Sequence, residues 1–121
     1  MQKPIAHVID DDAAVRASVR LLLKGGGIEA RPYASAEAFL REATPDDGCL
    51  IIDVDMPGID GLELLDQLRA NRINTPAIMI TGAGITGSLV SAIKRFDAML
   101  LEKPFLPGEL LSSVKRALGR F

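Results

Sequence analysis

The sequence of 121 residues contains one cysteine, Cys49, so no disulfide bond can form within the chain. Because Cys49 lies in an apolar run, we expect a buried and unreactive thiol. No apolar run approaches the roughly 18 residues of a membrane span, and the N-terminus shows no signal-peptide pattern. The 14 basic residues do not outnumber the 16 acidic ones, so nothing predicts a basic face for nucleic acid. These absences favour a cytoplasmic domain that binds neither membrane nor nucleic acid directly.

With 48% hydrophobic residues the chain can bury a core, and its length predicts one domain over residues 1–121. Five short apolar runs have the length of strands, and several are apolar at consecutive positions. This pattern is typical of parallel strands that are covered on both faces. The runs are 5–10, 28–33, 49–53, 77–81 and 98–102.

Apolar side chains recur at helical spacing after each of the five runs. The glycines of "KGGG" at 24–27 end the first helix, and Asp12, Ser35 and Asp60 stand where helix N-caps are expected. The alternation of strands and helices predicts an α/β fold, a parallel sheet with right-handed crossovers and helices on both faces. The helical stripes are Val15, Val19, Leu22 and Leu23; Phe39, Leu40 and Ala43; Leu64, Leu65 and Leu68; Leu89, Val90 and Ile93; and Leu110, Leu111, Val114 and Leu118.

Polar side chains stand where four of the five strands are expected to end. Three aspartates, Asp10 to Asp12, follow the first run, Asp53 ends the third, Thr81 ends the fourth, and Lys103 follows the fifth. In sheets of this kind, binding sites form beyond the carboxyl ends of the strands. We therefore expect these polar groups to lie close together.

Several carboxylates at one point cannot all stay ionised without a positive counter-charge. A hard cation such as Mg2+ takes oxygen ligands, usually one or two carboxylates with water and phosphate oxygens. An aspartate beside such a metal can also act as a nucleophile toward a phosphoryl group, a reaction that needs mainly positioning and charge neutralisation. Taken singly, the same residues could cap a helix, end a strand in a turn or carry a solvated charge. Their occurrence together at four strand ends favours a site for Mg2+ and a phosphoryl group.

The motifs "HVIDDD", "LIIDVDMPGIDGLELL", "AIMITGAG" and "LLEKPF" follow one another in this order along the chain. Together they resemble the receiver domain of bacterial two-component response regulators, and the likeness covers the whole chain. The segments "SAEAFL", "MITGAG" and "EKPF" are most similar in sequence to the FixJ-type branch. The resemblance implies a flavodoxin-like, doubly wound (βα)5 fold whose five-stranded parallel sheet has the order 2-1-3-4-5.

By this resemblance Asp53 is the phosphoacceptor, and Asp10 and Asp11 form an acidic pocket. Asp11 and Asp53 would contact Mg2+ directly, Asp10 would act through water, and the backbone carbonyl of Asp55 would complete the protein ligands. Gly61 takes the position of the family's glycine in the loop after the phosphorylated strand.

Thr81 would be the switch hydroxyl that moves toward an attached phosphoryl group. Lys103 would pair with a phosphoryl oxygen, and the Lys103–Pro104 peptide bond would be cis. The resemblance implies phosphorelay signalling, with phosphate supplied by a histidine kinase or a histidine phosphotransfer protein. His7 is not that histidine; it lies mid-strand, and we expect it to be a core or strand-face residue. The domain would not be an enzyme beyond promoting its own phosphorylation and dephosphorylation.

Three residues depart from the family pattern. Leu100 replaces the switch aromatic, and it can repack but offers no ring or hydroxyl. Phe96 and Met99 stand where the family usually has a glycine and an acidic residue. They could simply pack in the core, or they could belong to a homodimer or partner surface. That surface would consist of the fourth helix, the fifth strand and the fifth helix, which is the expected readout surface.

Other functions fit parts of the sequence. "GAGITG" at 82–87, with Glu102 about 20 residues on, fits the dinucleotide-binding fingerprint, but too little chain follows for that fold. The same stretch has Ser88 where a Walker loop needs lysine. "IIDVDMPG" resembles the D-x-D motif of haloacid-dehalogenase phosphatases, which carry it on their first strand. A receiver-like scaffold that binds partners without phosphate is a further alternative.

Overall fold

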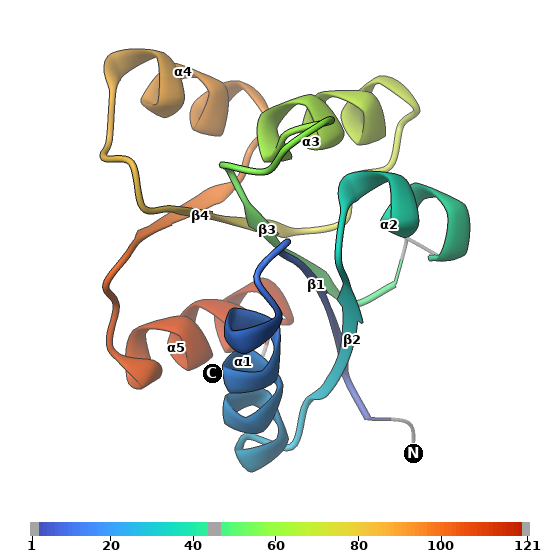
Figure 1. Ribbon diagram of the computed structural model, residues 1–121, viewed down its shortest axis with the longest axis vertical. Coiled ribbons are helices and arrows are strands. Elements are labelled where there is room, and N and C mark those ends of the chain that lie inside the picture. Colours follow the sequence, from blue (N-terminus) through green and yellow to red (C-terminus); the bar gives the residue numbers. More distant parts are fainter. Residues whose placement is uncertain (1–2, 44–46, 120–121) are drawn as a thin grey trace.

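Five parallel strands form a sheet through the middle of the protein in the computed structural model, which describes residues 3–43 and 47–119 (Figure 1). The order β2-β1-β3-β4-β5 confirms the doubly wound α/β fold expected from the sequence. Asp10, Ile28 and Ala98 lie just outside the strands, so three strands are one residue shorter than expected. The strands are β1 (Ile5–Ile9), β2 (Glu29–Tyr33), β3 (Cys49–Asp53), β4 (Ala77–Thr81) and β5 (Met99–Glu102).

Helices cover both faces of the sheet, with α1 and α5 on one side and α2, α3 and α4 on the other (Figure 1). Strand side chains alternate between the two layers. In β3, Leu50 and Ile52 belong to the core under α2 and α3, whereas Ile51 belongs to the core under α1 and α5. Among the described residues, no helix has the length and apolar character needed to cross a membrane. The helices are α1 (Ala13–Gly25), α2 (Ala36–Glu42), α3 (Gly61–Ala70), α4 (Gly87–Arg95) and α5 (Pro107–Ala117).

Side-chain caps fix the helix starts that the sequence predicts. Asp12 accepts hydrogen bonds from two backbone N–H groups in the first turn of α1, and Ser35 accepts one in the first turn of α2. Asp60 and Glu63 form a reciprocal capping box at the start of α3. At the other end of α1, the N–H of Gly26 caps the last carbonyls. Because the caps fix where α1 and α3 begin, they also fix the loops that follow β1 and β3.

Leu40 and Val90 are exceptions to the predicted apolar stripes, with 42% and 36% of their surfaces exposed. Each follows a buried residue, Phe39 or Leu89, and one step along a helix turns the side chain by about 100°. Helices α2 and α4 flank α3 in their layer, so each has one side that no other helix covers (Figure 1). The prediction that Leu40 and Val90 face the core is therefore wrong.

The one cysteine and the one histidine are both buried, as predicted for Cys49 and as one of the two positions expected for His7. Cys49 and His7 are 0% exposed, and burial raises the pKa of the Cys49 thiol to about 12, which keeps it unreactive. The ring of His7 packs against those of Tyr33 and Phe39. Its Nδ1 shares a hydrogen bond with the Tyr33 hydroxyl at 3.3 Å, and its Nε2 shares one with the Asp47 carboxylate at 2.9 Å. His7 is thus a core residue with both ring nitrogens satisfied.

Replacing Gly61 with alanine should destabilise the fold. A Cβ at Gly61 would lie 2.3 Å from the backbone oxygen of Asp53, which forces β3 or α3 to shift. Overpacking of this kind costs about 1–3 kcal/mol. Gly87→Ala at the start of α4 is the matched control, because a Cβ there meets nothing within 4 Å. Denaturant unfolding should show the loss for Gly61→Ala alone, and equal stability of the two variants would contradict the close approach.

Candidate functional site

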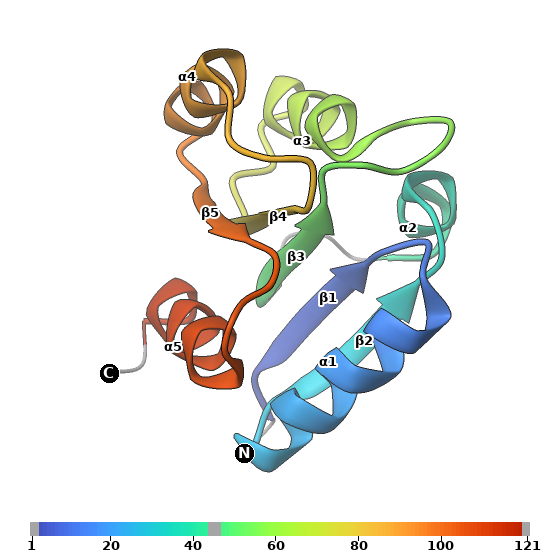
Figure 2. The same ribbon diagram turned by 60° about the vertical axis from the view of Figure 1, so that its left-hand side comes forward.

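The carboxyl ends of β1 and β3 bring three aspartates together. The two strands are neighbours, with Ile9 beside Ile52, so Asp10 and Asp53 follow at the same edge of the sheet (Figure 2). One carboxylate oxygen from each of Asp10, Asp11 and Asp53 lies within 4.8 Å of the other two. The structure thus gathers the acidic residues that the sequence singles out, at the place where parallel strands end.

The two carboxylates nearest the sheet are shielded from water. Asp10 and Asp53 are 3% and 6% exposed, whereas Asp11 is open to solvent. Asp10 accepts a hydrogen bond from the N–H of Asp12 at 2.9 Å, and Asp53 accepts one from the N–H of Asp55 at 3.2 Å. Burial, and to a lesser degree the adjacent Asp10 carboxylate, raises the pKa of Asp53 to about 6. Burial also raises the pKa of Asp10, so the ionised pair is unfavourable in the metal-free domain.

Lys103 brings a positive charge to this acidic pair. Its Nζ lies 3.9 Å from Oδ2 of Asp10 and 4.0 Å from Oδ2 of Asp53. Lys103 lowers the pKa of both carboxyls, but by less than burial raises them. The Lys103–Pro104 peptide bond is cis, as the resemblance implies. Separations near 4 Å exceed those of direct hydrogen bonds, so both carboxylates remain able to accept further ligands.

Thr81 lies at the end of β4, one strand from Asp53, and is 1% exposed. Its Oγ1 donates to the carbonyl of Gly84 at 3.4 Å and accepts from the N–H of Ala83 at 3.3 Å. Both hydrogen bonds are long, so the hydroxyl is held weakly in its present position. The backbone carbonyl of Thr81 accepts a shorter hydrogen bond, of 2.8 Å, from the N–H of Lys103. This hydrogen bond joins the ends of β4 and β5.

The donor set suits a hard divalent cation. Carboxylate oxygens from three aspartates meet within 4.8 Å, and the exposed Asp11 leaves one side open to water. Mg2+ is held in proteins by a few carboxylates together with several waters. The carbonyl of Asp55 follows Asp53 in the same loop, and its place among the ligands stays a prediction.

Arg16 is a residue of this site that the sequence analysis missed. Its Nη1 donates a hydrogen bond of 2.7 Å to the backbone carbonyl of Asp10. The bond ties the first turn of α1 to the loop that carries Asp10 and Asp11. A sequence signal existed, because side chains in a helix point back toward its N-terminus and Arg16 stands one turn after the cap Asp12.

The residues that depart from the family pattern lie in or beside the core. Phe96 is 7% exposed and belongs to the same core as Leu50 and Ile52, and the Arg95 guanidinium covers its ring at 4.6 Å from the centroid. Leu100 is half-buried against the same core, and Met99 is half-buried against the core on the other face. Of the two roles considered for Phe96, the structure supports core packing.

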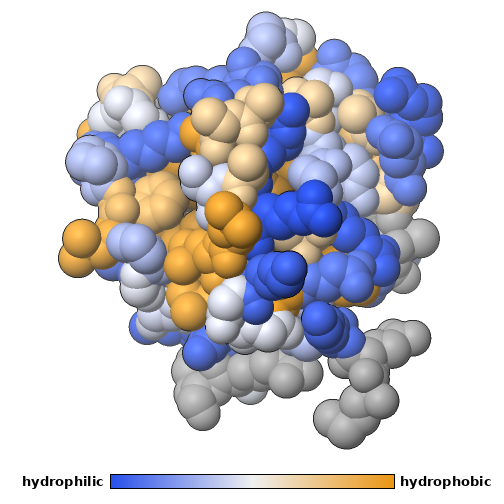
Figure 3. Space-filling view, turned by 60° about the horizontal axis from the view of Figure 1, so that its bottom comes forward, coloured by the Kyte–Doolittle hydropathy of each residue, from blue (hydrophilic) through white to orange (hydrophobic). Residues whose placement is uncertain are grey.

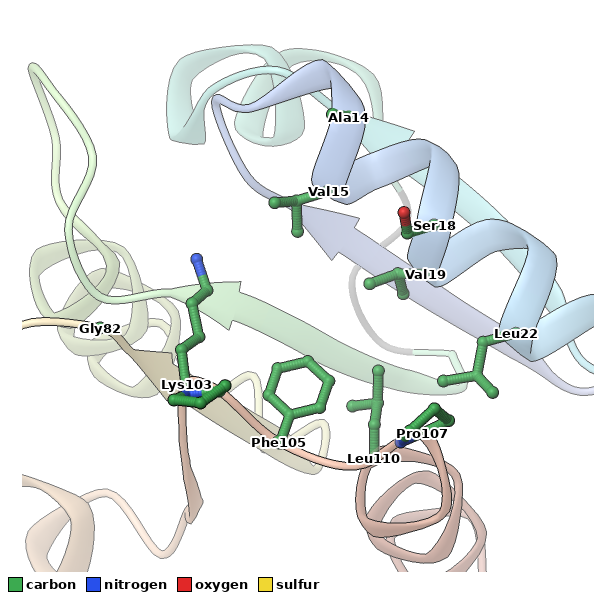
Figure 4. A pocket seen from close by; sticks show the side chains of 11 residues that line it. Ala14, Val15, Ser18, Val19, Leu22, Gly82, Lys103, Phe105, Pro107 and Leu110 are labelled. Atoms are coloured by element: carbon green, nitrogen blue, oxygen red, sulfur yellow. The ribbon is translucent and has the colours of Figure 1, made fainter.

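An apolar groove runs from Lys103 along α1, opposite the segment that joins β5 to α5. Its volume is about 740 Å3. Figure 4 shows Val15 and Val19 of α1 on one wall, Phe105 and Leu110 on the other, and Lys103 at the end of the groove. The surface in Figure 3 has a patch of apolar side chains beside a strongly polar area, on the side of the molecule where α1 and α5 lie.

The fold and the cluster of Asp10, Asp11 and Asp53 at the ends of the strands identify the class of protein. The sequence profile of the response regulator receiver domain matches residues 6–115, and the chain belongs to that family. Receiver domains are parts of two-component signalling systems rather than metabolic enzymes. Membership leaves the dinucleotide-binding and haloacid-dehalogenase alternatives without support.

Among known relatives, the FixJ-type branch expected from the sequence is confirmed. The transcriptional regulatory protein FixJ of Azorhizobium caulinodans is 45% identical over 115 residues, which cover 94% of this chain and 54% of that protein. The chain therefore spans about half the length of this relative. The crystal structure of FixJ-N superposes with a TM-score of 0.86 at 38% identity, covering 100% of this chain and 98% of that one. The chemotaxis protein CheY4 of Vibrio cholerae gives 0.83 at 27% identity, covering 97% and 100%.

Replacing Asp53 with asparagine should stabilise the metal-free domain at neutral pH. Folding raises the pKa of this carboxyl from 3.8 to about 6. Between pH 3.8 and about pH 6, the folded state therefore binds more protons than the unfolded state. Stability therefore falls as pH rises through this window. The full effect is on the order of 3 kcal/mol.

Denaturant unfolding at about pH 4 and about pH 7 measures this effect. Asp53→Asn should match the unaltered protein near pH 4 and exceed it near pH 7. Asp66→Asn, which removes an exposed carboxylate of α3, should leave the pH dependence unchanged. If the free energy of unfolding changed with pH in the same way for the unaltered protein and Asp53→Asn, the charge of Asp53 would not be destabilising.

Proposed function

We propose that this chain accepts a phosphoryl group on Asp53, with Mg2+, from a histidine kinase or a histidine phosphotransfer protein. The observation that supports this most is the buried pair of Asp10 and Asp53, with the exposed Asp11 and the Lys103 ammonium beside it. A signalling role in the cytoplasm, as expected from the sequence, is part of the proposal.

In the proposed reaction, a carboxylate oxygen of Asp53 attacks phosphorus while the bond from phosphorus to the donor's histidine nitrogen breaks. Mg2+, held by Asp11 and Asp53 and through water by Asp10, would neutralise charge on the phosphoryl oxygens. Lys103 can pair with another phosphoryl oxygen, because its ammonium already stands about 4 Å from both buried carboxylates. The hydrogen bond from Arg16 keeps the β1–α1 loop in place while charge moves across the site.

The attached phosphoryl group would act as a switch through Thr81. A phosphoryl oxygen is a charged acceptor and therefore stronger than the carbonyl of Gly84, which the hydroxyl now meets at 3.4 Å. Movement of Thr81 would free space at the end of β4, and Leu100 on the neighbouring strand would repack, although it has no ring. The readout surface is α4, β5 and α5, through which two chains could pair as a homodimer. The shift is modest, because a ligand moves an equilibrium only by its differential affinity for the two states.

Labelling with a small phosphodonor tests the proposal. Acetyl phosphate with Mg2+ should add one phosphoryl group per chain, measured by intact-mass spectrometry. Asp53→Asn should abolish the labelling, because it removes the nucleophile, and chelation of the metal should suppress it. Asp66→Asn on the exposed face of α3 should label normally.

Two other outcomes would replace the proposal. Steady Mg2+-dependent turnover of an aryl phosphate, without a lasting adduct, would indicate a phosphatase. Absence of any adduct in a folded protein that still binds its partner would indicate a scaffold that acts without phosphate.

We assign the apolar groove beside Lys103 to the phosphodonor protein. A donor histidine must approach Asp53 from the carboxyl edge of the sheet, and the groove begins at that edge, at Gly82 and Lys103. Apolar walls from α1 and α5 give the donor a surface on which binding buries area.

Ser18→Arg should slow phosphotransfer from a phosphohistidine donor by about tenfold or more, because Ser18 is exposed and lines the groove. Labelling by acetyl phosphate should be unchanged. Ala17→Arg is the matched control, since it adds the same charge to another side of α1, outside the groove. Equal rates of protein-to-protein transfer for the two variants would show that the donor docks elsewhere.

A further inference from the structure

A second hollow lies at the amino-terminal ends of strands β4 and β5, opposite the carboxyl ends where the Asp53 site lies. Its walls include Pro76, just before β4, and Ala98 and Met99, where β5 begins. The volume of the hollow is about 570 Å3. The phosphoacceptor site lies at the other ends of the same strands, so the proposed phosphoryl chemistry makes no use of this hollow.

Three arginines from three different helices line the hollow: Arg69 of α3, Arg95 of α4 and Arg116 of α5. Asp97 is the one acidic residue among the described residues of the lining. Within the parts of the chain that the structure describes, none of the three guanidinium groups lies within 4.0 Å of a carboxylate oxygen. The lining therefore carries an excess of positive charge, although the whole chain has a net charge of -2.

Arg69 is held in a fixed orientation. Its Nε donates to the carbonyl of Phe96 at 3.0 Å, and its Nη1 donates to the carbonyls of Ile73 and Thr75, each at 2.9 Å. Its Nη2 forms no hydrogen bond with a described residue, so two N–H donors remain for a ligand. Burial lowers the pKa of Arg69, and the negative charge of Asp97, which raises it, offsets this only in part.

Arg95 is also oriented, since its guanidinium lies over the ring of Phe96 at 4.6 Å from the centroid. The negative ends of α3, α4 and α5 lie nearby and favour basic residues, as in many helices. That preference acts on each helix separately within its last turn. It does not require three arginines to line one hollow and leave their planar donor groups without carboxylate partners.

We infer that this hollow binds a small anion with two or more negative groups, such as an oligophosphate or a polycarboxylate, between Arg69, Arg95 and Arg116. Guanidinium groups bind both phosphate and carboxylate through paired N–H donors, so an anion of either kind fits this hollow. Such a ligand would join α3, α4 and α5 and so would influence the arrangement of two helices of the proposed readout surface.

Titration with pyrophosphate and, separately, with citrate tests the inference and separates the two chemistries. The readout is heat of binding together with amide chemical shifts, in Mg2+-free buffer. We expect saturable binding of at least one anion, with shifts around Phe96 and Ala98 rather than around Asp53. The double variant Arg95→Gln and Arg116→Gln should weaken binding by about a hundredfold, about tenfold for each charged contact.

The matched control is Arg20→Gln with Lys24→Gln, which removes two positive charges from α1, away from the hollow. This control should bind as the unaltered protein does, and so should Asp53→Asn, whether or not Asp53 is the phosphoacceptor. If the double arginine variant unfolds, Arg116→Gln alone is used, because Arg116 is exposed. Absence of saturable binding, or equal weakening in the α1 control, would overturn the inference.

Discussion

The burial of two neighbouring carboxylates, those of Asp10 and Asp53, is the constraint on which the site depends. Burial, and to a lesser degree the charge of Asp10, raises the pKa of Asp53 to about 6, and the Lys103 ammonium near 4 Å compensates only in part. Buried carboxylate pairs of this kind are typical of functional sites, where a bound ligand offsets the cost. A divalent cation and a phosphoryl group are the partners that fit this charge pattern.

The fold provides this arrangement through strand order. Because β1 and β3 are adjacent at the centre of the sheet, the residues that follow them emerge side by side, and β4 and β5 bring Thr81 and Lys103 to the same edge. The rest of the molecule holds these ends in place. The close contact of Gly61 with the backbone of Asp53 and the bond from Arg16 to the Asp10 carbonyl both act on the loops that carry the acidic groups.

Much of this could be predicted from the sequence, because apolar runs, caps and polar strand ends are local signals. Asp10, Asp53 and Lys103 could be placed together by the rule that parallel strands end at one edge. The exposure of Leu40 and Val90 could not be predicted, because it depends on how α2 and α4 lie beside α3. The groove at Lys103 and the arginine-lined hollow were also missed, since each is made by residues that only the packing of distant helices brings together.

The most direct test of the account is a Mg2+ titration of the unmodified domain, followed by amide chemical shifts. We expect saturable shifts confined to the loops after β1 and β3, and their loss in Asp11→Asn, which removes the exposed carboxylate and leaves both buried carboxylates in place. Shifts scattered over the acidic surface, or the same binding in Asp11→Asn, would contradict the claim that these carboxylates share a cation.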